Sequence, residues 1–353
     1  MTKKLNSVFV LVLIILHSSC IKKVQVPIRN VEPILVVEGL ITNDSVPYQV
    51  KLSYSGSYTF GNQIPTELYE ANALVSISDS EGAGTPLFYR EKGLYETNDK
   101  NFIGTPGKGY TLHIKLPNGK EYISEEQVIP EPVPIQEVSS IQHEFTYDLK
   151  RPTRFNIFIT SADPADQENY YRWVSDGWVP RKATGVPCGF FCIEFEFCHQ
   201  HISESSVRIF SDNAINGNKI INQLVGSSYL YYFGRHYIRI SQLSMTRSSY
   251  QFWNSFQLQL ESSGGLLDAI PSSINSGIYN VNNPADRALG IFEASAVAHY
   301  RFILVPENVS NFLLQQTALP FIETGACHLI YDNAIEIPPP PGWETAPEIR
   351  VVL

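Results

Sequence analysis

Short stretches in which apolar and polar residues alternate, separated by turn-forming residues, constrain the fold of this chain more than any other feature. In residues 110–116, four large apolar side chains alternate with Thr, His and Lys, which is the period of a strand with one buried face. Asn118 and Gly119 then suit the positive φ angles of a tight hairpin, and residues 121–124 return as a second strand. Such strands recur through residues 33–129 at the spacing typical of an immunoglobulin-like sandwich. We therefore expect a mainly β protein with an N-terminal immunoglobulin-like β-sandwich.

A proline-rich stretch at residues 130–138 marks the end of this predicted sandwich. Each proline fixes φ and biases the preceding residue away from helix, so the stretch is a stiff extended connector. Strand-like segments rich in aromatic and β-branched residues resume at 155–160 and 170–174, and the last two strands are predicted at 289–295 and 298–303. We predict a second β-rich domain with one or two helices at 139–337, followed by a proline-rich tail at 338–353.

One helix is predicted near residues 244–262. Ser244 can accept the hydrogen bond of an N-cap, and the glycine pair 264–265 can end the helix. Apolar residues recur between them at helical spacing, and such a stripe packs on a core more often than it stacks on a ligand. The aromatic members of the stripe are Phe252, Trp253 and Phe256. We expect them to pack on the sheet of the second domain.

The N-terminus carries an export signal. Two lysines, an apolar run at 8–16 and small residues before Cys20 follow in the order that a secretory signal requires. The run is about half the length that spans a bilayer, and nothing after Cys20 approaches about 18 consecutive apolar residues. We predict a lipoprotein signal peptide at 1–19, acylation of Cys20 and a tether at 20–32. Because His17 stands where Leu is usual, a plain secretory signal that leaves Cys20 as an ordinary thiol is the alternative.

The charge of the chain argues against two classes of partner. The sequence has 26 basic and 35 acidic residues, a formal net charge of −9, and loss of residues 1–19 would remove two lysines and no acidic residue. A negative protein is poorly suited to nucleic acid or to electrostatic docking on anionic lipid. The apolar content of 43% is sufficient for packed cores. We expect a globular body that binds no nucleic acid.

Four further cysteines follow the predicted lipidation site, Cys20. They are Cys188, Cys192, Cys198 and Cys327. An even number in an exported protein favours disulfides, and three connectivities are possible. If all four are bridged, at least one of the first three must pair with Cys327. A metal site is the alternative, because a histidine follows Cys198 and another follows Cys327, but only Cys188 and Cys192 approach the spacing of a zinc site. We expect disulfides, with no metal or cofactor.

Sequence motifs indicate no catalytic chemistry. The chain lacks a serine nucleophile elbow, a zinc-protease helix motif and a glycine-rich dinucleotide loop. Asp163, Asp166 and Glu168 could serve acid–base catalysis or hold an ion, but we favour a solvated turn before the strand that begins at Tyr170. Residues 212–217 begin like a calcium loop, yet Ala stands at one ligand position and Gln at the position of the bidentate Glu. We therefore predict a protein without enzymatic activity.

Several segments taken together resemble a family of Bacteroidota lipoproteins known as domain of unknown function 4249. The matching segments are 35–41, 71–79, 93–95, 109–114, the proline connector, 163–164 with 169–173, 278–280 and 289–297. Two features differ from the family pattern. Members often carry two close cysteines before a C-terminal Pro-x-Trp tail, whereas here Cys327 stands alone. Surface-displayed lipoproteins of the phylum often have acidic residues after the lipid cysteine, whereas here residues 21–23 are Ile, Lys and Lys, which leaves the membrane face open.

The resemblance implies an outer-membrane lipoprotein held by the lipid on Cys20, in a family whose genes commonly neighbour those of TonB-dependent receptors. Our leading expectation is a non-catalytic accessory subunit that helps such a receptor capture or present cargo. The alternative is a free-standing adhesin or glycan- or protein-binding module, in which Trp178, Tyr231 and Trp343 would form stacking platforms. A hydrolase that uses the carboxylates between 163 and 168 is a third hypothesis. The family has no defined catalytic residues to carry over.

Overall fold

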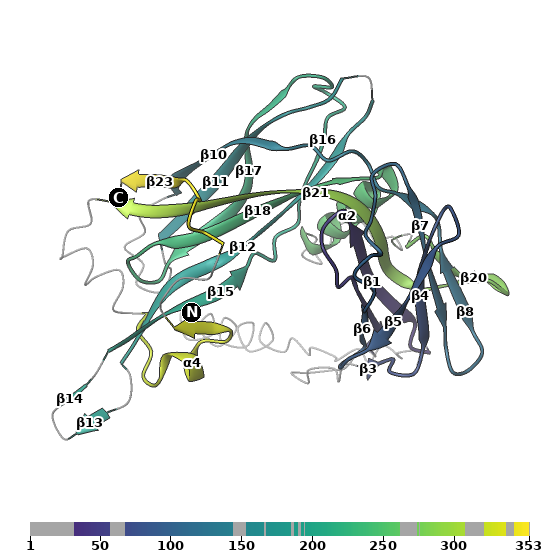
Figure 1. Cartoon of the computed structure of the whole chain (residues 1–353), viewed down its shortest axis with the longest axis horizontal. Helices are drawn as coiled ribbons and strands as arrows, with labels where there is room; N and C mark the ends of the chain where they lie inside the picture. The colour runs from purple at the N-terminus through teal and green to yellow at the C-terminus, as the bar shows by residue number, and fades with distance from the viewer. Residues whose placement is uncertain are drawn as a thin grey trace, which may run out of the picture. The chain divides into compact units, whose positions relative to one another are not determined.

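The computed structural model is mainly β, as expected (Figure 1). It describes residues 32–56, 68–143, 153–165, 167–184, 187–189, 192–193, 195–261, 274, 276–307, 321–336 and 342–352. The predicted lipidation site, Cys20, and most of its tether lie outside these ranges. Among the described residues, no helix is long and apolar enough to cross a membrane.

The N-terminal strands form one antiparallel group around a common core. They are β1 (Leu35–Thr42), β2 (Gln49–Tyr54), β3 (Leu68–Tyr69), β4 (Leu74–Asp79), β5 (Gly84–Tyr89), β6 (Leu94–Thr97), β7 (Gly109–Lys115), β8 (Glu121–Ser124) and β9 (Gln127–Val128). Alternate residues of β7 are buried, including Leu112 and Ile114, which lie in the core with Val50 and Ile77. The predicted hairpin joins β7 to β8, and Gly119 has a φ of 87°. The immunoglobulin-like topology of this group remains a prediction.

Three strands from far along the chain complete this first sheet. Strand β19 (Ile278–Asn280) pairs with β8 and with β20 (Asn283–Arg287), while the first part of β21 (Leu289–Glu307) runs parallel to β1. The segment predicted as a second domain, 139–337, therefore contributes strands to the sheet of the first. At Gly290, where φ is 90°, a Cβ atom would lie 1.9 Å from the carbonyl oxygen of Val37. The β1–β21 contact therefore requires glycine at this position.

The remaining strands follow in the second part of the chain, and most of them surround a second core. They are β10 (Ile135–His143), β11 (Thr153–Ala162), β12 (Tyr170–Ala183), β13 (Pro187–Gly189), β14 (Cys192–Ile193), β15 (Glu196–Ser203), β16 (Arg208–Ser211), β17 (Lys219–Leu230), β18 (His236–Met245), β22 (Ala334–Glu336) and β23 (Glu348–Val352). Strands β10, β11 and β17 form a separate three-stranded sheet. Phe155, Trp173 and Phe302 are fully or almost fully buried in this core. The proline connector is anchored there, because Val133 is buried and its carbonyl accepts a 2.8 Å hydrogen bond from Gln242 Nε2.

Strand β21 links the two cores. The sequence predicts two strands, 289–295 and 298–303, but the structure has one continuous strand of 19 residues. Its first part pairs with β1 up to Ser295, and its second part pairs with β18 from Ala296 onward. Residues 291–296 are all buried, so both faces of β21 are covered where the partner changes.

Helix α2 (Arg247–Glu261) begins three residues later than the predicted cap. Ser244 lies in β18, where it pairs with Ala296, so it is not available as an N-cap. Thr246 replaces it, because the Ser249 backbone N–H donates a 3.2 Å hydrogen bond to Thr246 Oγ1. The aromatic stripe packs as predicted, since α2 contacts β12, β16 and β21 and Phe252 is buried. A second, short helix, α4 (Cys327–Ile330), lies against β15.

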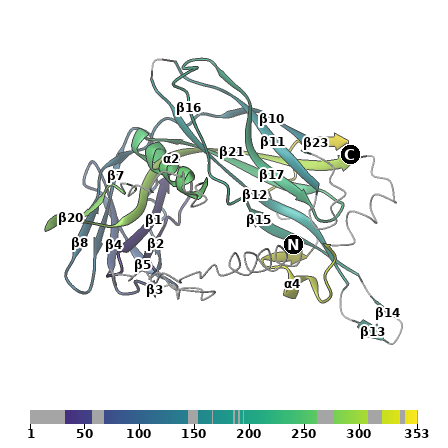
Figure 2. The same ribbon diagram turned by 180° about the vertical axis from the view of Figure 1, so that it is seen from behind.

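A disulfide bridges Cys198 in β15 and Cys327 in α4, with Cα atoms 6.3 Å apart. This confirms the prediction that Cys327 pairs with one of the three clustered cysteines. Cys188 and Cys192 lie on the β13–β14 hairpin, of which the structure describes the backbone alone. Both views show this hairpin beyond the end of the β12–β15 ladder (Figure 2).

Candidate functional site

The predicted carboxylates do not form an open acid–base site. Asp163 is buried and accepts hydrogen bonds from the Tyr171 hydroxyl at 2.6 Å and the Gly217 backbone N–H at 3.0 Å. Glu168 is half exposed and binds Tyr170 instead. Asp166 lies outside the described residues. The interpretation of Asp163 as part of a solvated turn is therefore wrong. Its carboxylate is buried and binds both strand β12, through Tyr171, and the turn that contains Gly217.

Asp212 is the neighbour that sequence analysis did not associate with Asp163. It is fully buried, and its Oδ1 atom has no hydrogen-bond donor among the described residues. Burial raises the pKa of Asp212, a backbone hydrogen bond from Asn169 to the carboxylate opposes that rise, and the charge of Asp163 raises the pKa further. A proton on Asp212 can then be shared with Asp163. Among the described residues, no group of three or more His, Cys, Asp or Glu side chains could hold a metal ion.

The aromatic residues predicted as stacking platforms are largely covered. Trp343 is buried and packs on Tyr237 with ring centroids 5.8 Å apart, so it is not a platform. Trp178 packs beside the same cluster and contacts the edge of His201. The Arg181 guanidinium lies 3.4 Å from the centroid of Tyr231 and covers its ring. These side chains therefore stabilise the protein itself.

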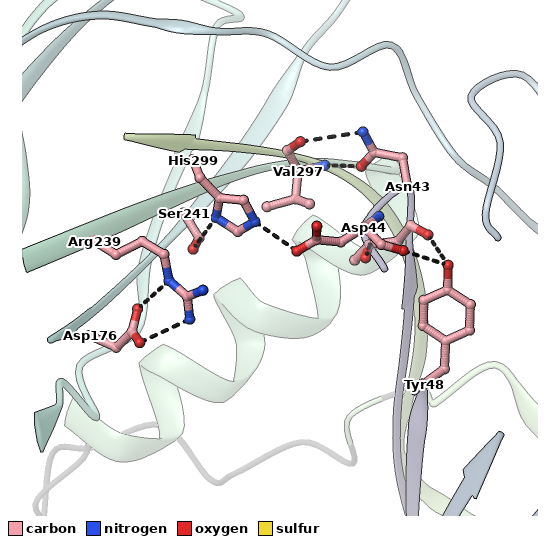
Figure 3. Close-up of polar contacts among 9 residues, drawn as sticks. Asn43, Asp44, Tyr48, Asp176, Arg239, Ser241, Val297 and His299 are labelled. Carbon is pink, nitrogen blue, oxygen red and sulfur yellow. Dashed lines mark hydrogen bonds and ion pairs between the residues drawn. The ribbon is translucent and has the colours of Figure 1, made fainter. Parts of the chain in front are cut away.

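A chain of polar contacts joins the turn after β1 to the face of β18 and β21 (Figure 3). Ser241 and His299 are cross-strand partners, and the Ser241 hydroxyl lies 2.9 Å from His299 Nδ1. On the other side of the ring, His299 Nε2 lies 2.7 Å from Asp44 Oδ2. Asn43 adds a second link, because its Oδ1 accepts a 2.6 Å hydrogen bond from the Val297 backbone N–H.

Charges around this polar chain keep Asp44 ionised. Burial alone would raise the pKa of Asp44, but the hydrogen bond and charge of His299 and the Ser45 backbone N–H outweigh it and lower the pKa. Arg239 adds a smaller effect in the same direction. This guanidinium is itself paired through two 2.9 Å hydrogen bonds with Asp176, as Figure 3 shows.

The order serine, histidine, aspartate is that of a nucleophilic triad, but the surroundings do not suit catalysis. Ser241 is 8% exposed and lies within a continuous strand, directly opposite its histidine. A substrate carbonyl therefore has little access to the hydroxyl. We interpret the contact as a structural tie. Sequence spacing could not reveal it, because His299 is 58 residues from Ser241 and 255 from Asp44.

One open cavity has the form of a ligand site. We call it the α2 pocket, a cavity of about 390 Å³ beside the first turns of α2. We call its polar lining residues the wall, and they include Glu125, Gln127, Ser248, Gln251, Ser255 and Ser276. We call its buried apolar lining residues Phe252, Ile291 and Phe292 the floor. Sequence analysis identified none of its polar residues, because they come from three separate segments and carry no motif. Phe252 was assigned to the core, which is correct, and it also forms the pocket floor.

The fold and the cavity can now be set beside known proteins. No match was found among curated proteins. Residues 21–301 match the family described as domain of unknown function (DUF4249). The match begins directly after Cys20 and extends into β21, so it covers the N-terminal strands and most of the strands around the second core. The chain therefore belongs to the DUF4249 family.

Proposed function

We propose that this protein is a non-catalytic binding subunit, anchored in the outer membrane by a lipid on Cys20, that helps a TonB-dependent receptor capture or present its cargo. The observation that carries the binding role is the α2 pocket, which is open and lined by polar groups. The acidic pair Asp163–Asp212 and the Ser241 hydroxyl are buried instead. A protein that offers an open cavity and keeps its reactive groups covered is suited to binding.

Sequence features support the proposed location. The export signal ends at a cysteine that can be acylated, and a lipid chain on that residue would hold the body at a membrane surface. The disulfide between Cys198 and Cys327 suits an oxidising compartment outside the cytoplasm. The proposal of a receptor partner depends on the family resemblance, because members of the family are commonly encoded beside TonB-dependent receptors.

A specific surface feature favours the second candidate, a free-standing adhesin or a glycan- or protein-binding module. Phe195 and Phe197 are 48% and 46% exposed near the disulfide. The Lys182 ammonium lies 3.9 Å from the centroid of Phe195 and 5.3 Å from that of Tyr232. Exposed aromatic side chains beside a cation are typical of protein interfaces. This aromatic patch would serve an adhesin without any receptor.

A pull-down distinguishes the two candidates. The tagged lipoprotein is extracted from its native membranes in mild detergent, and co-purifying proteins are identified by mass spectrometry. One TonB-dependent receptor at a near one-to-one ratio supports the accessory subunit. The Cys20→Ala variant, which cannot be acylated, controls for capture after lysis. A preparation of intact, acylated protein without any receptor would contradict the proposal and favour the adhesin.

A further inference from the structure

We propose that the α2 pocket binds a small saccharide of one or two sugar units. The inference rests on the proposed function, since a cargo-capturing subunit needs a ligand site, and it names the chemical class of the ligand. Ligand pockets in proteins occupy roughly 300–1,000 Å³. At about 390 Å³ the α2 pocket lies near the lower end of that range, which suits a small ligand.

The polar wall of the pocket suits hydroxyl groups. Glu125 offers carboxylate acceptors, and Gln127 and Gln251 offer amide donors and acceptors. Ser248 and Ser276 already donate to Gln127 Oε1 and to the Ala288 carbonyl, so they offer hydroxyl oxygens as acceptors, whereas Ser255 can also donate. A sugar hydroxyl also donates and accepts, so it can be satisfied by any of these groups. None of the described lining residues is Lys, Arg or His. The pocket therefore disfavours phosphate and other anions, which need a positive partner.

One amide of the wall is already oriented. Gln127 Oε1 lies 2.7 Å from Thr246 Oγ1 and 3.0 Å from Ser248 Oγ, so the N-terminal turn of α2 fixes one end of the side chain. Gln127 Nε2 donates to none of the residues that the structure describes. Because Gln127 lines the pocket, its amino group can donate to a ligand oxygen at little entropic cost.

The floor of the pocket is apolar, and this surface allows the pocket to bind a sugar ring in preference to a simple polyol. Phe252, Ile291 and Phe292 are at most 9% exposed and form a fixed base. Phe252 is held by Phe256, whose ring is nearly parallel at a centroid distance of 6.3 Å. A pyranose presents C–H groups on its ring faces and hydroxyls around its rim. The α2 pocket has apolar and polar groups in its lining, so it can contact both kinds of surface.

Peptide ligands fit the pocket less well. Peptides are commonly captured as an added strand on a sheet edge, as a helix in a long apolar groove or as an extended proline-rich segment on aromatic rings. The α2 pocket is a compact cavity beside a helix and offers none of these surfaces. A short peptide is therefore kept as a contrasting probe in the test.

The test is saturation-transfer NMR on the mature acylated protein in a detergent without a sugar headgroup. The probes are glucose, N-acetylglucosamine, maltose and cellobiose, with trialanine and inorganic phosphate as contrasts, each at millimolar concentration. We expect saturable transfer to at least one saccharide and none to either contrast. Gln251→Ala removes an exposed wall group and should weaken binding at least fivefold, and Gln127→Leu at least tenfold. Asn254→Ala, on the same helix but outside the pocket, should leave binding unchanged.

Two results would overturn the inference. One is absence of transfer to all four saccharides from folded wild-type protein, and the other is equal binding by the wild type and the Gln251→Ala and Gln127→Leu variants. Preferential binding of trialanine would assign the pocket to peptides. The receptor pull-down is independent of all these outcomes. A recovered receptor with no saccharide binding removes this inference alone, whereas saccharide binding without a receptor contradicts the proposed partner alone.

Discussion

At the scale of single residues, burial decides the protonation of two titratable side chains. His236 has no exposed surface, its Nδ1 lies 2.7 Å from the Ser228 hydroxyl, and its Nε2 has no described partner. Burial, with a smaller contribution from the charge of His199, lowers the pKa of His236 to about 3. Asp212 shows the opposite direction, because burial favours the protonated form of an acid and the neutral form of a base.

His236 should make the protein sensitive to acid. Its folded-state pKa lies below the ordinary value of 6.5, so the unfolded chain binds the proton first as the pH falls. The contribution to stability is complete above about pH 6.5 and decreases by roughly 1.4 kcal/mol per pH unit toward pH 3. The double variant His236→Leu, Ser228→Ala removes both members of this hydrogen bond. The pH dependence of its unfolding free energy should be smaller by the contribution of about one bound proton.

Urea unfolding at pH 4.5 and 7.5 measures the effect. The Ser228→Ala single variant is the control, because it retains the histidine and should retain the acid sensitivity. An unchanged difference in unfolding free energy between the two pH values in the double variant would show that His236 is not the responsible group.

The acidic pair makes a prediction of the opposite sign. Because the folded-state pKa of Asp212 is raised, its ionisation opposes folding, and stability is lost as the pH rises through that pKa. Asp212→Asn can donate to Asp163 and still accept from Asn169. At pH 8 its free energy of unfolding should therefore be equal to the wild-type value within roughly 0.5 kcal/mol, or higher. Asp163→Asn places an amino group against the Gly217 N–H or the Tyr171 hydroxyl and should lose about 1–3 kcal/mol.

Urea unfolding at pH 5 and pH 8 compares the two asparagine variants. They differ in the carboxyl that is replaced and share the same change in charge, so each serves as the control of the other. Equal destabilisation by both substitutions at pH 8 would disprove proton sharing.

At the scale of secondary-structure elements, a buried ion pair holds α2 on the second core. Glu293 is 1% exposed and accepts hydrogen bonds from Arg172 at 3.0 Å and Trp253 Nε1 at 2.8 Å. Arg172 also lies over the Trp253 ring, 4.5 Å from its centroid. The helix therefore depends on a charged group of β21 as well as on its apolar stripe, and the α2 pocket depends on the helix.

Breaking this pair should destabilise the protein strongly. Glu293→Ala leaves the Arg172 side chain, 13% exposed, without its carboxylate, and removal of one member of a buried pair typically costs about 3–5 kcal/mol. Adding Arg172→Met removes the unpaired charge and should restore part of that loss. Chemical denaturation of the single and double variants measures the coupling. Strictly additive losses would show that the two side chains do not act as a pair.

At the scale of the whole molecule, covalent and backbone links tie together segments that are distant in sequence. Strand β21 pairs with β1 in one sheet and with β18 in the other. The Cys198–Cys327 disulfide closes a separation of 129 residues and fixes α4 to β15. Long loops lose the most conformational freedom when they are closed, so the disulfide restricts the unfolded chain considerably.

Loss of this disulfide should reduce stability. The Cys198→Ser, Cys327→Ser double variant should lose about 2–5 kcal/mol of unfolding free energy. In the oxidised wild-type protein, thiol titration under denaturing conditions should find no free cysteine, since we expect Cys188 and Cys192 to pair as well. Reduced wild-type protein provides the control. An unfolding midpoint that does not change on reduction or in the double variant would show that the bridge contributes little.

The sequence alone determined the β class, the β7–β8 hairpin and the aromatic helix, because strand period, turn chemistry and helical spacing are encoded within a few neighbouring residues. The predicted connector at 130–138 extends only as far as residue 134, because β10 begins at Ile135. The tertiary structure alone decided which distant groups meet. Asp163 meets Asp212, His299 meets Asp44, and the strand predicted as two becomes one that serves both sheets. The wall of the α2 pocket could not be predicted from the sequence either, since Glu125, Ser248 and Ser276 become neighbours only through strand pairing and helix docking. Local patterns record which face of an element is buried, whereas contacts across many residues depend on topology that no local pattern contains.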